Sequence, residues 1–191
     1  MVEAGKFFTD AFWTGKVGGG TKVLAPYQSK QLTNQQISEF RRRYGARLSP
    51  DKQSELFLCR NGNNALIGCL GIEVDTIQRS DGANRVRAPL MSNVAVGRKF
   101  RRRGVGEELV KKAEEVARKQ WGYDECYLYV EKRNTPAVRL YKKLGYRTVW
   151  EDDDCKTLVP TESGRVVSQS TVILCLKKKL GGGLFPSFFG S

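Results

Sequence analysis

Hydrophobic residues recur along the chain with two different periods, which predict alternating strands and helices. Residues 88–96 are a continuous apolar run with several β-branched side chains, typical of a buried strand. In the segment that follows, apolar residues recur at helical spacing and Glu–Lys or Glu–Arg pairs stand four residues apart. We therefore predict a helix from Val105 to Trp121, ended by Gly122.

The same reasoning predicts the neighbouring elements. Residues 123–130 alternate in polarity and indicate a strand, and 136–144 indicate a helix capped by Thr135 and closed by Gly145. Residues 55–60 and 65–77 predict a β-hairpin, and 171–176 a last strand. Thr33 and Gln36 form a capping box, which predicts a helix ending at Gly45.

The chain is long enough, at 191 residues, for one domain with a sizeable core. We assign that domain to residues 29–180, after an N-terminal arm at 1–28 that mixes aromatic residues and glycine without a steady period. A flexible tail is expected at 181–191. Residues 15–22 come close to a phosphate-binding loop, but the final Lys and Thr are in the wrong order and no strand precedes them.

A glycine-rich loop joins the strand at 88–96 to the helix that follows. It reads Arg101-Arg102-Arg103-Gly104-Val105-Gly106. A loop that opens a helix directs several backbone N–H groups at one point, where the helix dipole also favours an anion. Glycine at two positions lets the backbone approach phosphate oxygens closely and tolerates a positive φ. The loop therefore predicts a pyrophosphate site.

This order of elements resembles the GCN5-related N-acetyltransferase (GNAT) superfamily. The loop matches its Arg/Gln-x-x-Gly-x-Gly/Ala fingerprint, and residues 134–146 match its later Asn-x-x-Ala-x-x-Leu-Tyr-x-x-x-Gly-Tyr segment. The segments 90–96 and 150–154 look most like a cyanobacterial and plastid-type branch. The resemblance implies an α/β (α+β mixed) fold, with a twisted mixed sheet of six or seven strands and helices on both faces. Its coenzyme would lie where two parallel strands splay apart.

The resemblance also implies roles for residues around acetyl-CoA, the cosubstrate. Strand residues would bind the pantetheine arm, the glycine loop would bind the pyrophosphate, and the start of the next helix would contact the coenzyme. Tyr141 matches the general acid that protonates the departing thiolate. The expected coenzyme contacts are Val94, Ala95, Val96, Arg101, Arg102, Arg103, Gly104, Val105, Gly106, Glu107, Asn134, Thr135, Pro136 and Tyr141.

The general base is not assigned by the resemblance, because the glutamate positions used elsewhere in the superfamily fall near Leu90 and at Tyr129. Glu73, Glu131 and Tyr129 are the candidates, acting directly or through water. Glu73 lies on the strand face opposite Leu70, Ile72 and Val74, where a glutamate ordinarily faces solvent.

Composition narrows the chemistry further. The chain has no histidine and five cysteines that form no Cys-x-x-Cys motif, so we expect no metal site and a reducing compartment. The net charge of +13 is spread over several clusters, and we expect no nucleic-acid partner. With no apolar run long enough to cross a bilayer and no signal-peptide pattern, we expect a cytoplasmic protein, or one in the plastid stroma.

The predicted function is transfer of acetyl from acetyl-CoA to a primary amine by direct attack, most simply on protein N-terminal α-amines and lysine side chains. At pH 7 about one α-amine in ten is unprotonated, against roughly one lysine in a few thousand, so a site without an obvious base suits N-termini better. Small amines or polyamines are the alternative acceptors. A non-catalytic acyl-CoA-binding regulatory domain is the alternative from another class.

Overall fold

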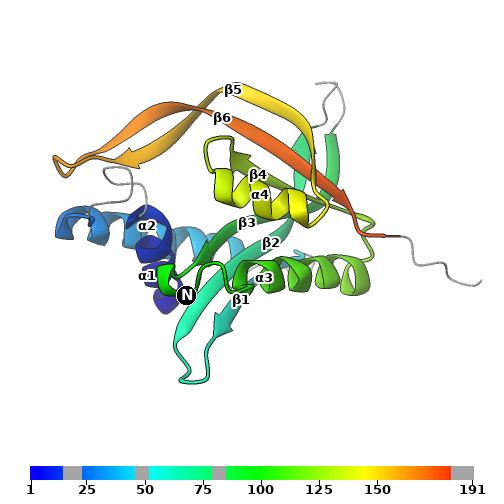
Figure 1. Cartoon of the computed structure of the whole chain (residues 1–191), viewed down its shortest axis with the longest axis horizontal. Helices are drawn as coiled ribbons and strands as arrows, with labels where there is room; N and C mark the ends of the chain where they lie inside the picture. The colour runs from blue at the N-terminus through cyan, green and yellow to red at the C-terminus, as the bar shows by residue number, and fades with distance from the viewer. Residues whose placement is uncertain (15–22, 46–51, 79–84, 182–191) are drawn as a thin grey trace, which may run out of the picture.

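The computed structural model describes residues 1–14, 23–45, 52–78 and 85–181. Its centre is a six-stranded sheet in the order β1-β2-β3-β4-β6-β5, in which only β3 and β4 pair in parallel (Figure 1). The predicted mixed sheet is thus confirmed, as is the predicted hairpin, formed by β1 and β2. The strands are β1 (Ser54–Arg60), β2 (Leu66–Gln78), β3 (Arg85–Val96), β4 (Glu125–Glu131), β5 (Arg147–Pro160) and β6 (Val166–Lys179).

Helices cover both faces of the sheet, as predicted (Figure 1). One face packs against α1 (Val2–Phe8), its π-helical continuation η1 (Thr9–Trp13) and α2 (Pro26–Tyr44). The other packs against α3 (Val105–Glu115), its continuation η4 (Val116–Gln120) and α4 (Thr135–Lys143). A short 3₁₀ turn, η3 (Arg98–Phe100), follows β3.

The N-terminal segment differs from the expected arm. Residues 2–13 are helical, and Ala4 and Phe8 are buried with Phe40 of α2, so this segment contributes to a core cluster. Phe8 stacks on Phe12 with ring centroids 4.9 Å apart. The sequence shows no clear period here because α1 turns into a π-helix, which shifts the spacing of the inward-facing residues. The stretch 15–22 and the tail beyond Gly181 lie outside the described residues.

Two predicted helix starts were wrong. α2 begins at Pro26 rather than near Thr33, with Ala25 at the N-cap and Pro at the first position. Asn134, not Thr135, caps α4, since Asn134 Oδ1 accepts a hydrogen bond from the Ala137 amide at 3.4 Å. Asn134 thereby satisfies one free amide of the first turn of α4, whereas at the start of α2 the Gln28 side chain accepts from the Ala25 amide.

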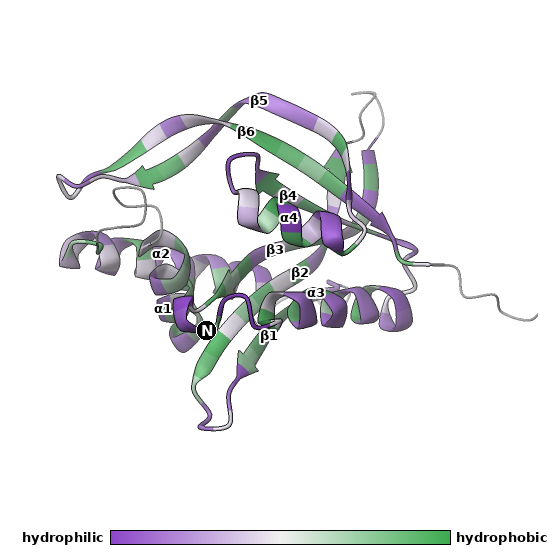
Figure 2. Cartoon of the chain, viewed as in Figure 1, coloured by the Kyte–Doolittle hydropathy of each residue, from purple (hydrophilic) through white to green (hydrophobic). Residues whose placement is uncertain are grey.

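β5 was not predicted as a strand, because much of its sequence is polar. In Figure 2 a stretch of β5 is hydrophilic, whereas the neighbouring β6 is largely hydrophobic. Residues 151–154 lie inside β5, and β5 is held in the sheet by its pairing with β6 along most of its length. The backbone ladder therefore overrides the low strand propensity of the acidic residues.

The β5–β6 hairpin extends across to α2, and Gln28 fastens its tip. Gln28 is 1% exposed, and its Nε2 donates to the backbone oxygens of Thr161 and Arg165, each at 2.9 Å. Gln28 Oε1 accepts from the Ala25 amide at 3.0 Å, so one side chain both caps α2 and holds the hairpin turn.

We expect Gln28→Met to loosen the hairpin tip, since it removes these three hydrogen bonds. The free energy of unfolding should fall by about 1–3 kcal/mol. Hydrogen exchange should quicken over residues 158–168, and unchanged protection there would contradict the proposed fastening. Gln31→Met, at an exposed position of the same helix, is the matched control.

Candidate coenzyme and acetyl-transfer site

The parallel strands β3 and β4 pair only briefly and then separate. Leu90 pairs with Tyr127 and Met91 with Leu128, and no later pair joins the two described strands. β3 nevertheless continues to Val96 and β4 to Glu131. The backbone N–H and C=O groups of Val94, Ala95 and Val96 that face β4 therefore form no hydrogen bonds with that strand. An opening of this kind between two strands accommodates an extended chain such as a pantetheine arm.

A β-bulge lies at the start of this opening. Two residues of β3, Asn93 and Val94, face the single residue Leu70 of β2, and Asn93 has φ 53°. Tyr44 of α2 fixes the bulge, since its hydroxyl lies 3.0 Å from Ser92 Oγ and accepts from Asn93 Nδ2 at 3.2 Å. Sequence reasoning missed this cluster. The signal was an asparagine inside a strand, because asparagine tolerates the left-handed conformation.

The glycine loop has the backbone geometry that an anion site requires. Gly104 adopts φ 86° and forms the N-cap of α3, with no side chain to accept from the first amides of the helix. A Cβ added at Gly104 would meet nothing within 4 Å, so the loop is open to an incoming ligand there. At Gly106 a Cβ would lie 3.3 Å from Leu140 Cδ2, so this glycine permits close packing of α3 against α4.

The side chain of Arg101 is directed away from the open side of the loop. Its Nε donates to the Val96 carbonyl at 3.1 Å, and its Nη2 to the Ala11 carbonyl of η1 at 2.7 Å. Arg101 therefore joins the end of β3 to the N-terminal helix. Arg102 and Arg103 are exposed, and Arg102 has φ 62°.

Glu107 links the helix that follows the loop to α4. Its carboxylate accepts from Lys143 Nζ at 2.8 Å and from Lys111 Nζ at 3.0 Å. These two hydrogen bonds lower the pKa of Glu107 to about 2, so the group is charged at neutral pH. A carboxylate repels phosphate, so only the backbone amide of Glu107 suits the predicted pyrophosphate site.

Tyr141 lies on the buried face of α4, and its ring meets the Tyr146 ring edge-on with centroids 5.9 Å apart. Burial raises the pKa of Tyr141 well above its usual value of about 10, so the hydroxyl stays protonated at neutral pH. No hydrogen bond to this hydroxyl is present among the described residues. It is available as a donor, which fits its predicted role better than any role as a base.

The remaining predicted coenzyme contacts gather at the start of α4. Asn134, Thr135 and Pro136 are exposed, and the first turn of α4 follows directly from the end of β4. They therefore lie next to the opening between β3 and β4.

The structure places the three base candidates on one sheet face, but in different environments. Glu73 is 6% exposed, which corrects the expectation that it faces solvent. Its carboxylate contacts Arg43 of α2 and accepts from Lys52 Nζ at 3.3 Å. The two cations compensate the desolvation of a buried charge. Both carboxylate oxygens are held in these ion pairs, which indicates a structural role.

Glu131 and Tyr129 lie near the end of β4. Arg133 Nε donates to Glu131 Oε2 at 2.7 Å, and Thr157 Oγ1 donates to Glu131 Oε1 at 3.0 Å. Tyr129 is 40% exposed and its ring packs beside Trp150. Desolvation raises the pKa of Tyr129 to about 12, so the phenol is neutral at pH 7 and is a poor base.

The described residues contain no group of three or more Cys, Asp or Glu side chains arranged to hold a metal ion. Their helices include none that is both long and apolar enough to span a membrane.

Comparison with known proteins identifies the family. The sequence model of the acetyltransferase (GNAT) family matches residues 23–146, which contain the glycine loop, the separating strands and α4. The chain therefore belongs to the GNAT family. This confirms the predicted superfamily.

Two curated relatives match the chain over short segments. A chloroplastic GCN5-related N-acetyltransferase 4 from Arabidopsis thaliana is 42% identical over 59 residues, which are 31% of this chain and 20% of that protein. An N-alpha-acetyltransferase from Sulfurisphaera tokodaii is 37% identical over 57 residues, which are 30% of this chain and 34% of that protein. The matched segments thus span about a third or less of either relative.

The fold also matches solved structures. The ribosomal-protein-S18-alanine N-acetyltransferase from Escherichia coli superimposes with a TM-score of 0.56 over 98% of this chain and 92% of its own. The sequences are 15% identical, so this likeness concerns the fold.

Proposed function

We propose that this protein transfers the acetyl group of acetyl-CoA directly to primary amines of polypeptides, at N-terminal α-amines and at lysine side chains. The observation that carries the proposal is the opening between β3 and β4, with the glycine loop following β3 and α4, which carries Tyr141, following β4. The amine attacks the thioester carbonyl, the C–S bond breaks, and the sulfur leaves with a hydrogen bond from Tyr141. Backbone amides of Val94 to Val96 would face the developing oxyanion.

The roles proposed for the coenzyme contacts follow from their positions. The amides of residues 104–107 would bind the pyrophosphate, and the β4-facing edge of β3 the pantetheine arm. Arg101 would act by holding this loop against η1, since its guanidinium already binds two carbonyls. Asn134, Thr135 and Pro136 would line the far side of the coenzyme.

No side chain is proposed as a strong base. Glu73 and Glu131 are held by cations or hydrogen bonds, and Tyr129 is neutral at pH 7. We infer that the acceptor amine loses its proton to water before or during attack. An N-terminal α-amine, with its lower pKa, would then react faster than lysine at neutral pH. The similarity to an N-alpha-acetyltransferase supports this preference.

The acidic residues 151–154 support a cationic acceptor. In the sheet register Glu131 of β4 pairs with Ile173 of β6, which pairs with Asp152 of β5. At a strand spacing of roughly 4.8 Å, Asp152 lies about 10 Å from the end of β4. A negative surface at this distance attracts positively charged peptides toward the site.

We expect the double variant Asp153→Lys/Asp154→Lys to raise KM for a lysine-rich peptide about three- to tenfold at low salt, with kcat little changed. Both residues are exposed, and this choice spares the 2.7 Å ion pair between Glu151 and Lys132. The effect should shrink at higher ionic strength, because salt screens exposed charges. An uncharged peptide is the control acceptor. Equal KM values for wild type and variant would exclude the steering role.

The test of the function is mass spectrometry of a peptide pool with free N-termini and lysines, incubated with acetyl-CoA in the presence and absence of the protein. Protein-dependent acetylation is the expected result, and the modified positions identify the preferred amine. An unmodified pool together with measurable acetyl-CoA binding would favour small-amine acceptors or the non-catalytic alternative. For location we propose the cytoplasm, with the plastid stroma as the alternative that the chloroplastic relative supports.

A further inference from the structure

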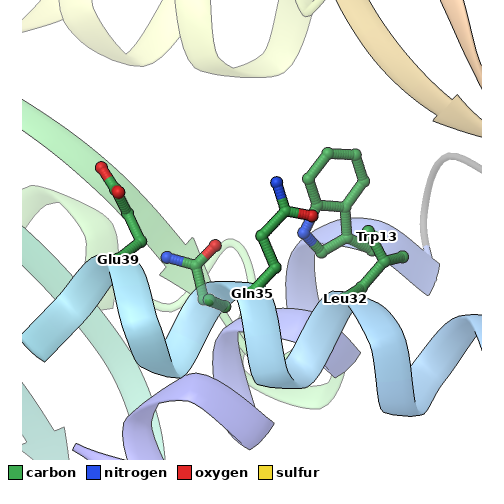
Figure 3. A pocket seen from close by; sticks show the side chains of 5 residues that line it. Trp13, Leu32, Gln35 and Glu39 are labelled. Atoms are coloured by element: carbon green, nitrogen blue, oxygen red, sulfur yellow. The ribbon is translucent and has the colours of Figure 1, made fainter.

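A small pocket lies beside α2, and the side chain of Trp13, from η1, forms part of its wall (Figure 3). Its volume is about 110 Å³. An indole ring, an aliphatic chain, two amides and a carboxylate line it: Trp13, Leu32, Gln35, Gln36 and Glu39. These groups can contact both an apolar and a polar part of a ligand, and the volume suits a small chemical group rather than a whole molecule.

Gln36 is the unusual member of this pocket. The residue is 8% exposed, yet its Nε2 is buried and has no hydrogen-bond partner in the described part of the chain. A buried donor without a partner is unfavourable, and such groups are rare in folded proteins. A small rotation of the Gln36 side chain within the pocket would bring Nε2 to an incoming oxygen acceptor, which would remove this penalty. The pocket is therefore suited to a ligand that carries a carbonyl or carboxylate oxygen.

The two segments that line the pocket, α2 and η1, are each linked by hydrogen bonds to the region of the opening between β3 and β4. Tyr44, at the end of α2, contacts the β3 bulge through Ser92 and Asn93. The other wall, η1, is held at the Ala11 carbonyl by Arg101. Gln36 lies eight residues before Tyr44, about 12 Å along the helix axis at 1.5 Å per residue. An extended peptide covers that distance with three or four residues.

We propose that this pocket is an acceptor subsite that binds a backbone peptide group of a polypeptide substrate. The inference rests on the proposed function and narrows its substrate class. The peptide carbonyl accepts from Gln36 Nε2, the neighbouring N–H donates to the side-chain oxygens of Gln35 or Glu39, and Trp13 and Leu32 cover the apolar part. Protonated polyamines carry donors alone at neutral pH, so they leave Gln36 Nε2 without a partner. The pocket thus favours peptides over polyamines.

The test compares two acceptors in the wild type and in Gln36→Met, a substitution of similar volume and helix propensity. One acceptor is a hexapeptide with a free N-terminus, and the other is an alkylamine of similar pKa without any carbonyl. We expect kcat/KM for the peptide to fall about tenfold in Gln36→Met. The value for the alkylamine and the Kd for acetyl-CoA should change less than twofold. Gln31→Met, exposed on α2 and outside the pocket, should leave all three values unchanged.

The melting temperature distinguishes a loss of peptide binding from a loss of protein stability in Gln36→Met. Since Gln36→Met removes an unpaired buried donor, the melting temperature of the unliganded variant should stay the same or rise. Loss of stability together with an equal fall for both acceptors would overturn the inference, as would an unchanged peptide kcat/KM. If the wild type acetylates the peptide but Gln36→Met shows no selective fall in kcat/KM for the peptide, the subsite is wrong and the proposed function still holds. A wild type that acetylates neither acceptor defeats the proposed function and the subsite together.

Discussion

Replacing Tyr141 with phenylalanine is expected to lower kcat about 100-fold and to leave the Kd for acetyl-CoA within about twofold. The change removes one hydroxyl and keeps the ring, which packs in the core against Tyr146. A positioned proton donor contributes about 10²–10⁴-fold to a rate, and we take the lower bound. Burial raises the pKa of Tyr141 above that of a free thiol, so full proton transfer to sulfur is uphill. The hydroxyl therefore acts chiefly by a hydrogen bond that strengthens as the C–S bond breaks.

Tyr146→Phe is the matched control. Tyr146 is 2% exposed, and its hydroxyl lies beside the side chains of Glu114 and Cys126. Removing this hydroxyl should leave kcat unchanged. Single-turnover measurement of acetyl transfer gives kcat for the chemical step, and calorimetry gives the Kd. A Tyr141→Phe protein with wild-type kcat would show that the hydroxyl takes no part in the reaction.

The raised pKa of Tyr141 also defines the expected pH profile of the wild type. Because the hydroxyl stays protonated below its raised pKa, its deprotonation should cause no fall in rate up to about pH 10. The rising limb should instead follow the acceptor amine, which must lose a proton before it can attack.

The sequence predicted the glycine loop, α3 and most of the strands because each rests on a local pattern, and the family and its mixed sheet followed from the resemblance that these motifs carry. The loop needs glycine for its backbone angles, and α3 and the predicted strands follow from the spacing of apolar residues. These elements are fixed by neighbours in the chain, so a single sequence is enough to find them.

Contacts between distant parts of the chain could not be predicted in this way. Glu73 alternates with apolar residues and so looks like a surface position, but Arg43 and Lys52 make its burial possible. The β5–β6 hairpin is fastened by Gln28, which lies 133 residues before Thr161. The pocket around Gln36 likewise depends on how η1 packs against α2. No period or motif in the sequence carries that information.

Replacing Gly104 with alanine should raise the Kd for acetyl-CoA at least tenfold, because the new methyl group enters the open side of the loop. It should also destabilise the protein by about 1 kcal/mol, since φ 86° is unfavourable for a residue with a Cβ. Gly122→Ala separates the two effects. Gly122 has φ 74° and also meets nothing within 4 Å, but it follows η4, at the end of the α3 segment remote from the loop. The two variants should lose similar stability in chemical denaturation. Only Gly104→Ala should weaken coenzyme binding in calorimetry, and equal Kd values for both variants would place the pyrophosphate elsewhere.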